Sequence, residues 1–478
     1  MELVTSNSIT KTKLIIYSLG ITLIALTSWS QDFSAEDLNR RTIERRAIEA
    51  VIWGMPVVNY ELMYQEMVRK VKGDFNQVLY WSRLLDSKNQ TLTPNPDVIY
   101  LMPFFNTKEV GPVVLEIPPA DDGVFNGSIM DRWQAAIEDV GPGGLDKGKG
   151  GKYLFLPPGF DKAKVPAGYI PMPSITYQGY ALLRSVLQSG SDADVAKAIA
   201  YSKRIKLYPL SQAKNPPATK FVDASGVDFD STIPYDLRFF ESLNRMIQAE
   251  PWLERDKAMI DPLKTIGIER GKPFNPDAAT KKILDDAILE AKAWFDARYD
   301  SLPPYYDGEH WFFPITEEMH KSVMNDWRVP DSYPVDARGT AYTLAFFSAK
   351  HVGQAQYYLL TGRDKDGQPL DGKNSYRLQV PGNAPVTQYW SMTVYNRDTH
   401  AFIHNAKSVG RSSQTPGLKK NEDGSTDIFF GPTAPSGQES NWVPTDPNGK
   451  FEVLARFYGP KPPLFDKTWK LPDIEKVK

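Results

Sequence analysis

The chain has 478 residues, of which 41% are hydrophobic and 24% are charged, and its formal net charge is -2. This length exceeds what one hydrophobic core usually serves, so we expect two or three domains, and the composition excludes a disordered chain. The balanced charge excludes the basic surface that nucleic-acid binding needs, and the absence of cysteine excludes disulfides, thiolate metal sites and a cysteine nucleophile.

The first 30 residues have the order of a secretory signal peptide. Two lysines precede an apolar run from Leu14 to Leu26, and the small residues Ser28 and Ser30 follow. The run is shorter than the ~20 apolar residues that span a bilayer. We therefore expect a signal segment at 1–30 and a soluble protein exported to the periplasm or secreted, with an uncleaved anchor as the alternative.

The second segment, 31–185, is predicted to form an amino-terminal helix followed by a β-sandwich. Ser34 can cap a helix whose apolar positions repeat with a period near 3.6, and Gly54 and Pro56 should interrupt it. From residue 75 onward, short apolar runs alternate with Pro, Gly and Asn clusters, which is typical of antiparallel strands joined by tight turns.

The remaining chain divides into a helical domain at 186–310 and a strand-rich domain at 311–478. The clearest helix covers 275–299, where Asn275 can cap and Pro276 can take the first helical position. A further helix is expected at 336–353. The segment 451–458 alternates like a half-buried strand, and a carboxy-terminal sandwich or jelly roll is the natural closure.

The glycine-rich stretch 141–159 contains G-x-x-x-x-G-K from Gly143 to Lys149, which matches part of a nucleotide-binding P-loop. The next position is Gly150 instead of Ser or Thr, and a strand follows where a phosphate-binding helix would be needed, so a P-loop is excluded. Two interpretations remain. The stretch is a turn with solvated lysines, or its backbone N–H groups with Lys147 and Lys149 receive an anion.

Two polar loops are the other candidate site elements. In TPNPDVIY, prolines flank Asn95 and precede Asp97, and this stiff loop either presents the two side chains to a ligand or forms an Asx turn. In DRWQAAIEDVG, Asp131, Arg132 and Trp133 precede two further acids, and acid–base catalysis competes there with surface salt bridges.

Metal and serine-nucleophile motifs lack support. His400 and His404 form H-A-F-I-H without an identifiable third ligand, and the sequence around Ser408 is not a nucleophile elbow. No metal and no cofactor are expected. Aromatic residues near the carboxy-terminal strands, Tyr376 among them, suit either a sandwich core or ligand binding.

Short motifs spread in order over nearly the whole chain resemble one family. They are TPNPDVIY, DVGPGGLDKGKGGKYLFLPPG, DARG, LDGKNSYRL, PVTQYWSMTVYN, NEDGST, NWVPT, FEVLARFYGP and WKLP. Together they are similar to proteins with the paired domains of unknown function 1254 and 1214. The resemblance implies a multidomain α+β fold with an immunoglobulin-like β-sandwich, a helical bundle and a carboxy-terminal β jelly roll, and it implies no reaction.

Two functions follow as hypotheses. In the first, the protein is a hydrolase or lyase that acts on a small polar, anionic or hydroxyl-rich compound in an interdomain cleft, with Asp97 and Asp131 as acid and base. The expected substrate-binding residues are Asn95, Arg132, Trp133, Lys147, Lys149, Arg338 and Tyr376. In the second, it is a non-catalytic periplasmic ligand-binding or envelope-associated protein. A small ligand is the expected partner, nucleic acid is not, no membrane contact is expected beyond the export signal, and self-association is left open.

Overall fold

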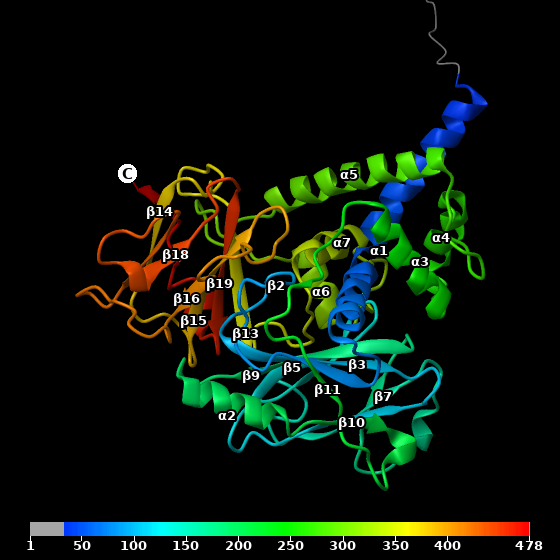
Figure 1. The fold of residues 1–478 in the computed structure, drawn as a ribbon, viewed down its shortest axis with the longest axis horizontal. Helices are drawn as coiled ribbons and strands as arrows, with labels where there is room; N and C mark the ends of the chain where they lie inside the picture. The colour runs from blue at the N-terminus through cyan, green and yellow to red at the C-terminus, as the bar shows by residue number, and fades with distance from the viewer. Residues whose placement is uncertain (1–32, 478) are drawn as a thin grey trace, which may run out of the picture.

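The computed structural model describes residues 33–477, and the predicted signal segment, 1–30, lies outside this range. The described chain combines helices with five β-sheets, none of which closes into a barrel within residues 33–477. Figure 1 shows an amino-terminal β-domain below, a carboxy-terminal β-domain to the left and a helical region above and between them. The predicted multidomain α+β class is therefore confirmed, while the immunoglobulin-like, bundle and jelly-roll labels stay predictions.

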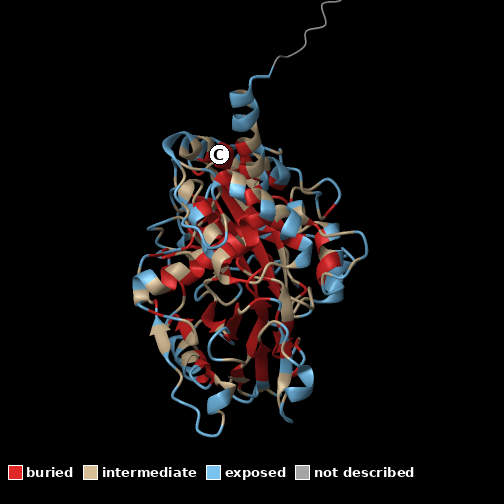
Figure 2. Ribbon diagram, turned by 90° about the vertical axis from the view of Figure 1, so that its right-hand side faces the viewer, coloured by how far each residue is buried: buried red, intermediate tan, exposed pale blue. Residues whose placement is uncertain are grey.

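The first helix, α1 (Ala35–Val71), is continuous, so the predicted interruption at Gly54 and Pro56 is wrong. Its start is as expected, because Ser34 Oγ accepts a hydrogen bond from the Asp37 N–H. The middle of α1 is buried on all sides, and tertiary packing outweighs the local helix breakers there. A Cβ on Gly54 would lie 2.9 Å from Leu243 of another helix, so glycine permits that close approach. Figure 2 shows the exposed start of α1 projecting from the buried interior.

The amino-terminal β-domain is built from two facing sheets. The larger sheet has the order β11-β1-β3-β9-β5-β6, and the smaller has the order β10-β4-β7-β8. The larger sheet's strands are β1 (Gln77–Tyr80), β3 (Val98–Asn106), β5 (Phe125–Asp131), β6 (Ala136–Val140), β9 (Gln178–Val186) and β11 (Phe221–Asp223). The smaller sheet's strands are β4 (Val113–Ile117), β7 (Gly151–Leu156), β8 (Ile170–Pro173) and β10 (Lys206–Pro209). Helix α2 (Asp192–Ser202) packs against the core of this sandwich. A separate two-stranded sheet pairs β2 (Asn89–Gln90) with β12 (Phe229–Asp230).

The helical region surrounds α1 and shares one hydrophobic core with it. Its members are α3 (Leu237–Ala249), α4 (Lys257–Ile260), α5 (Ala278–Asp300), α6 (Glu317–Met324) and α7 (Val335–Leu344). The expected cap of α5 is shifted by two residues, because the Asp277 carboxylate accepts from the Thr280 N–H at 2.7 Å, and Pro276 precedes the helix.

The helix predicted at 336–353 ends at Leu344, and residues 345–355 follow without regular structure. Ala345 is already extended. The backbone N–H groups of Lys350 and His351 donate to the Asp139 carboxylate of β6, at 2.9 and 2.7 Å, instead of to helix carbonyls. We call residues 345–355 the connecting segment.

The carboxy-terminal β-domain has two four-stranded sheets, β13-β19-β15-β16 and β18-β17-β14-β20. Their strands are β13 (Gln356–Thr361), β14 (Ser375–Val380), β15 (Trp390–Asn396), β16 (Gly410–Ser412), β17 (Thr426–Gly431), β18 (Trp442–Pro444), β19 (Phe451–Tyr458) and β20 (Glu475–Val477), and α8 (Pro462–Phe465) follows β19. The prediction that β19 is half-buried is wrong, since all eight of its residues are buried. One face meets the other carboxy-terminal sheet, and the opposite face meets the rest of the molecule.

No helix in residues 33–477 combines the length and the apolar character that crossing a bilayer requires.

Candidate functional site

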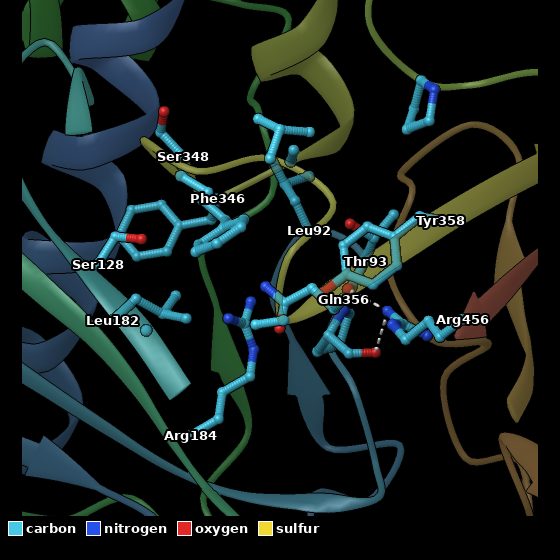
Figure 3. Close-up of a pocket in the computed structure, with 18 of the residues that line it drawn as sticks. Leu92, Thr93, Ser128, Leu182, Arg184, Phe346, Ser348, Gln356, Tyr358 and Arg456 are labelled. Carbon is cyan, nitrogen blue, oxygen red and sulfur yellow. Dashed lines mark hydrogen bonds between the residues drawn. The ribbon is translucent and has the colours of Figure 1, made fainter. Parts of the chain in front are cut away.

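The candidate site is a cavity of about 160 Å³ between the two β-domains and the helical region. Strand alternation explains why it has this lining. In β9, Ala181 and Leu183 point into the amino-terminal sandwich, so Leu182 and Arg184 point out of it toward the cavity. In β19, Val453 and Ala455 fill the carboxy-terminal core, which leaves Leu454 and Arg456 for the cavity from the opposite side (Figure 3).

The cavity wall is mostly apolar, with few charged side chains. The main apolar contributors are Met63, Trp81, Leu85, Leu92, Met102, Leu182, Phe313, Ile315, Met319, Val323, Leu344, Phe346, Phe347 and Leu454. The buried residues form its floor, whereas 313–315 and most of 351–358 are partly exposed and form its mouth. Such a lining favours a small ligand with an apolar body and few polar groups.

Arg184, on the floor of the cavity, is a buried arginine with one nitrogen that residues 33–477 leave unpaired. Only 4% of the residue is exposed, and its Nε donates to the Tyr100 hydroxyl at 3.3 Å. Its guanidinium lies over the ring of Phe347, 4.3 Å from the centroid. Within the described residues Nη1 has no hydrogen-bond partner, and the groups that surround this charge are the phenols of Tyr100, Tyr358 and Tyr458 instead of carboxylates. An arginine cannot lose its proton in a protein, so Arg184 is a buried cation with no ion-pair partner among the described residues, although the Asp139 carboxylate lines the same cavity.

Arg456 is also buried, but its hydrogen bonds are made within the chain. Nη1 donates to the Thr393 hydroxyl at 2.9 Å, and Nη2 donates to the carbonyls of Thr93 and Pro94 and to the Tyr395 hydroxyl, at 2.7, 3.2 and 2.6 Å. Figure 3 shows its bonds to the 93–94 backbone as dashed lines. Arg456 therefore fixes the loop that leads into β3, whereas Arg184, the other arginine of the cavity lining, keeps Nη1 unpaired within the described residues.

A histidine and a carboxylate lie at the edge of the cavity. His351 Nδ1 is 3.1 Å from Asp139 Oδ2, and the Ser128 hydroxyl donates to Asp139 Oδ1 at 2.6 Å. All three residues line the cavity. Asp139 also accepts the two N–H groups of the connecting segment, so it fixes both the orientation of the imidazole and the position of that segment.

The two predicted catalytic acids lie in separate networks. Burial raises the pKa of Asp97, while Arg456 and the hydroxyls of Ser391 and Ser412 lower it. Burial likewise raises the pKa of Asp131, against the backbone N–H of Ala135 and the more distant Arg255 and Arg338. Neither carboxylate lines the cavity. The structure thus does not bring this acid pair together around it.

The predicted binding residues of the amino-terminal loops serve different contacts. Asn95 Nδ2 donates to the hydroxyls of Tyr389 and Tyr458, at 3.0 and 2.9 Å, and ties the TPNPD loop to the carboxy-terminal sheet. Arg132 is 1% exposed and donates to Glu61 at 2.5 Å, with Glu250 at 3.6 Å. Trp133 packs against Trp53 in the helical core.

The remaining predicted residues also lie away from the cavity lining. Arg338 is buried, stacks near Trp327 and donates to the Trp133 carbonyl at 2.5 Å. Tyr376 is in the carboxy-terminal core, where its hydroxyl accepts from the Asp371 N–H. Lys147 and Lys149 are exposed.

The glycine-rich stretch is a turn that is closed by its own carboxylate. Asp146 accepts the N–H groups of Gly141 and Gly150, at 2.7 and 3.1 Å. Gly141 and Gly150 have φ of 91° and 70°, which glycine adopts without strain. The backbone donors that an anion would need are thus partly taken by Asp146, although Gly143 of the same turn reaches the cavity edge.

Sequence reasoning missed Arg184, Arg456 and His351. A signal was present for the arginines, because each lies in a mostly apolar strand: Arg184 is the one charged residue of YALLRSV, and FEVLARFY contains Arg456 with Glu452. A charge in a fully buried strand needs a partner or a function. His351 carried no signal, since its position depends on the end of α7 and on Asp139, more than 200 residues earlier in the chain.

Comparisons with known proteins agree with this architecture. A family model described as a protein of unknown function (DUF1254) matches residues 75–209, and a second with the same description (DUF1214) matches residues 355–462. The chain belongs to the family that pairs these two domains. No curated protein matches it.

Solved structures provide a likeness of fold. The VPA0106 protein from Vibrio parahaemolyticus is 19% identical with a TM-score of 0.57, and the match covers 91% of this chain and 100% of that one. An uncharacterized protein from Burkholderia cenocepacia is 10% identical with a TM-score of 0.42, over 92% and 95% of the two chains. The first supports the fold alone.

Proposed function

We propose that the protein binds a small organic acid, with an apolar body and one anionic group, in the cavity between its β-domains. The observation that carries this proposal is Arg184, whose buried Nη1 lacks a partner within the described residues while its cavity is lined mostly by apolar side chains. A buried cation without an anion costs stability, and a bound carboxylate would supply the missing charge-assisted hydrogen bond.

The size of the cavity guides the choice of ligand. A dry cavity of about 150 Å³ can hold benzene, and this one is of similar volume and open at its mouth. Phenylacetate and octanoate are therefore suitable test ligands. Their neutral amides, phenylacetamide and octanamide, keep the body and remove the charge.

The test is a thermal-shift and calorimetric comparison of each acid with its amide. We expect one acid molecule to bind per chain. At a concentration of 100 times its Kd, the acid should stabilise the folded protein by about 2.7 kcal/mol and so raise the unfolding midpoint. The amides should bind at least tenfold more weakly. Equal affinities of acid and amide, or no binding of either, would contradict the proposal.

A second candidate function, hydrolase or lyase, is favoured by His351 and Asp139. With its Nδ1–H donated to Asp139, His351 keeps Nε2 as a base at the edge of the same cavity. For an ester of the bound acid, Nε2 would take a proton from water as the water oxygen bonds to the carbonyl carbon. The carbon–oxygen bond to the alcohol then breaks, and the leaving alkoxide receives the proton.

The variant His351→Gln separates binding from this catalysis. If an ester of octanoate is hydrolysed, the variant should lose turnover by about 100-fold or more and keep the affinity for octanoate. His310→Gln is the matched control, because His310 pairs with Asp473 in the carboxy-terminal domain and does not line the cavity. No turnover by the wild type leaves binding as the function.

The predicted export would place either function in the periplasm. Its test is the first residue of the mature protein from a cell envelope fraction, which cleavage after Ser30 would make Gln31.

A further inference from the structure

Two further residues that line the cavity each carry a buried polar atom without a hydrogen-bond partner among the described residues. Asn89 is 2% exposed, its Oδ1 accepts from the Thr91 hydroxyl at 2.7 Å, and its Nδ2 has no partner. Gln356 Oε1 is buried and also has no partner. Both residues line the same cavity as Arg184.

The two residues come from different parts of the chain. Asn89 belongs to β2 of the amino-terminal part, while Gln356 begins β13 and pairs with Tyr458 of β19 in the carboxy-terminal sheet. Residue alternation puts Gln356 on the same face of that sheet as Tyr358, and Tyr358 is paired with Arg456. Figure 3 shows Gln356 among the residues that line the cavity, between Arg184 and Arg456 in this view.

The types of these atoms limit what can satisfy them. A carboxylate only accepts, so it suits Arg184 Nη1 but would repel Gln356 Oε1, which needs a donor. An aliphatic or aromatic body satisfies neither Asn89 nor Gln356. A hydroxyl donates one hydrogen bond and accepts others, so it serves a carbonyl oxygen or an amide N–H equally well.

We infer that the natural ligand is a hydroxy acid, an organic acid whose apolar body carries at least one hydroxyl that Gln356 or Asn89 binds. This inference rests on the proposed function and makes it specific. A site built to pair a hydroxyl discriminates against the analogue that lacks it, because the polar group of the protein is then left buried and unpaired.

The experiment compares matched ligands that differ by one hydroxyl. Mandelate is phenylacetate with a 2-hydroxyl, and 3-hydroxyoctanoate is octanoate with a 3-hydroxyl. Calorimetric titration of the full chain gives the ratio of the two Kd values within each pair. We expect at least one hydroxy acid to bind tenfold or more tightly than its parent acid.

Two variants assign the hydroxyl to a residue. Gln356→Leu and Asn89→Leu each remove one polar group, and at least one of them should reduce the Kd ratio to about one. For each variant, both Kd values of a ligand pair are measured on the same protein, so any general effect of the substitution on the fold affects both values and cancels in their ratio. Gln379→Leu is the matched control, because Gln379 is exposed on β14, does not line the cavity and should keep the wild-type ratio.

The outcomes distinguish this inference from the function that it extends. If no acid binds, the proposed function fails. If parent and hydroxy acids bind with equal affinity, acid binding stands and the hydroxy-acid inference is overturned. A preference that persists in both Gln356→Leu and Asn89→Leu would overturn the assignment to these residues.

Discussion

Replacing Arg184 by methionine should cost little stability and much affinity. The substitution removes one hydrogen bond to Tyr100, worth about 1 kcal/mol, and two contacts of the guanidinium with the rings of Phe347 and Tyr100, worth about 1 kcal/mol each. It also removes the desolvation cost of an unpaired buried cation, which is several kcal/mol. The free energy of unfolding without ligand should therefore change by no more than about 2 kcal/mol, in either direction.

Arg132→Met is the matched control, since Arg132 is equally buried but contacts Glu61 and Glu250. Its loss leaves two buried carboxylates without this partner and should cost about 3–5 kcal/mol. Urea denaturation of the ligand-free variants measures both values, and titration with octanoate measures affinity. Arg184→Met should bind octanoate about 10- to 100-fold more weakly. If it destabilises the free protein as much as Arg132→Met does, Arg184 is a structural residue and the reasoning is refuted.

Three further predictions concern the loops around the site. Asn95→Ala leaves the buried hydroxyls of Tyr389 and Tyr458 without their amide partner. Urea denaturation should show a free energy of unfolding lower by about 2–4 kcal/mol. A change below about 0.5 kcal/mol would show that Asn95 does not hold the TPNPD loop against the carboxy-terminal sheet. Asp146→Ala should lower the free energy of unfolding by a similar ~2–4 kcal/mol, because the N–H groups of Gly141 and Gly150 lose their acceptor. The double variant Lys147→Ala with Lys149→Ala should change neither stability nor octanoate affinity. Weaker octanoate binding by this double variant would support the turn as an anion-binding site. Burial raises the pKa of Asp97 in the folded protein above its ordinary value of 3.8. The protonated carboxyl is therefore tolerated in full below pH 3.8, and the folded protein loses stability as the pH rises through the raised pKa and the buried group becomes charged. Asp97→Asn should therefore gain stability relative to the wild type between pH 4 and pH 8, and a constant difference over that range would disprove the buried-charge cost.

The sequence predicted the order of β-rich, helical and β-rich parts because periodicity and turn residues are local. It also located the start of α1 through Ser34. It could not predict that α1 passes through Pro56, because the burial that stabilises this stretch comes from helices later in the chain. Similarly, the strand pattern of 451–458 identified one core face, but what covers the Arg456 face is a loop more than 300 residues earlier in the chain.

The candidate site was harder to predict than the fold for the same reason. The sequence singled out polar residues on loops. The structure places Asn95 and Arg132 in buried contacts between distant parts of the chain, and Asp131 in a buried local turn with Ala135. The unpaired charge at the cavity instead comes from Arg184, whose neighbours in the strand are mostly apolar. Which face of that strand meets another domain depends on domain packing, and a single sequence does not contain that information in readable form.

A crystal structure grown with 3-hydroxyoctanoate tests the central claim most directly. The expected result is one ligand in the cavity, with a carboxylate oxygen about 2.7–3.2 Å from Arg184 Nη1 and the alkyl chain among Leu182, Met102 and Phe346. A ligand bound elsewhere, or a carboxylate directed to solvent while Arg184 Nη1 stays without an anionic partner, would contradict it.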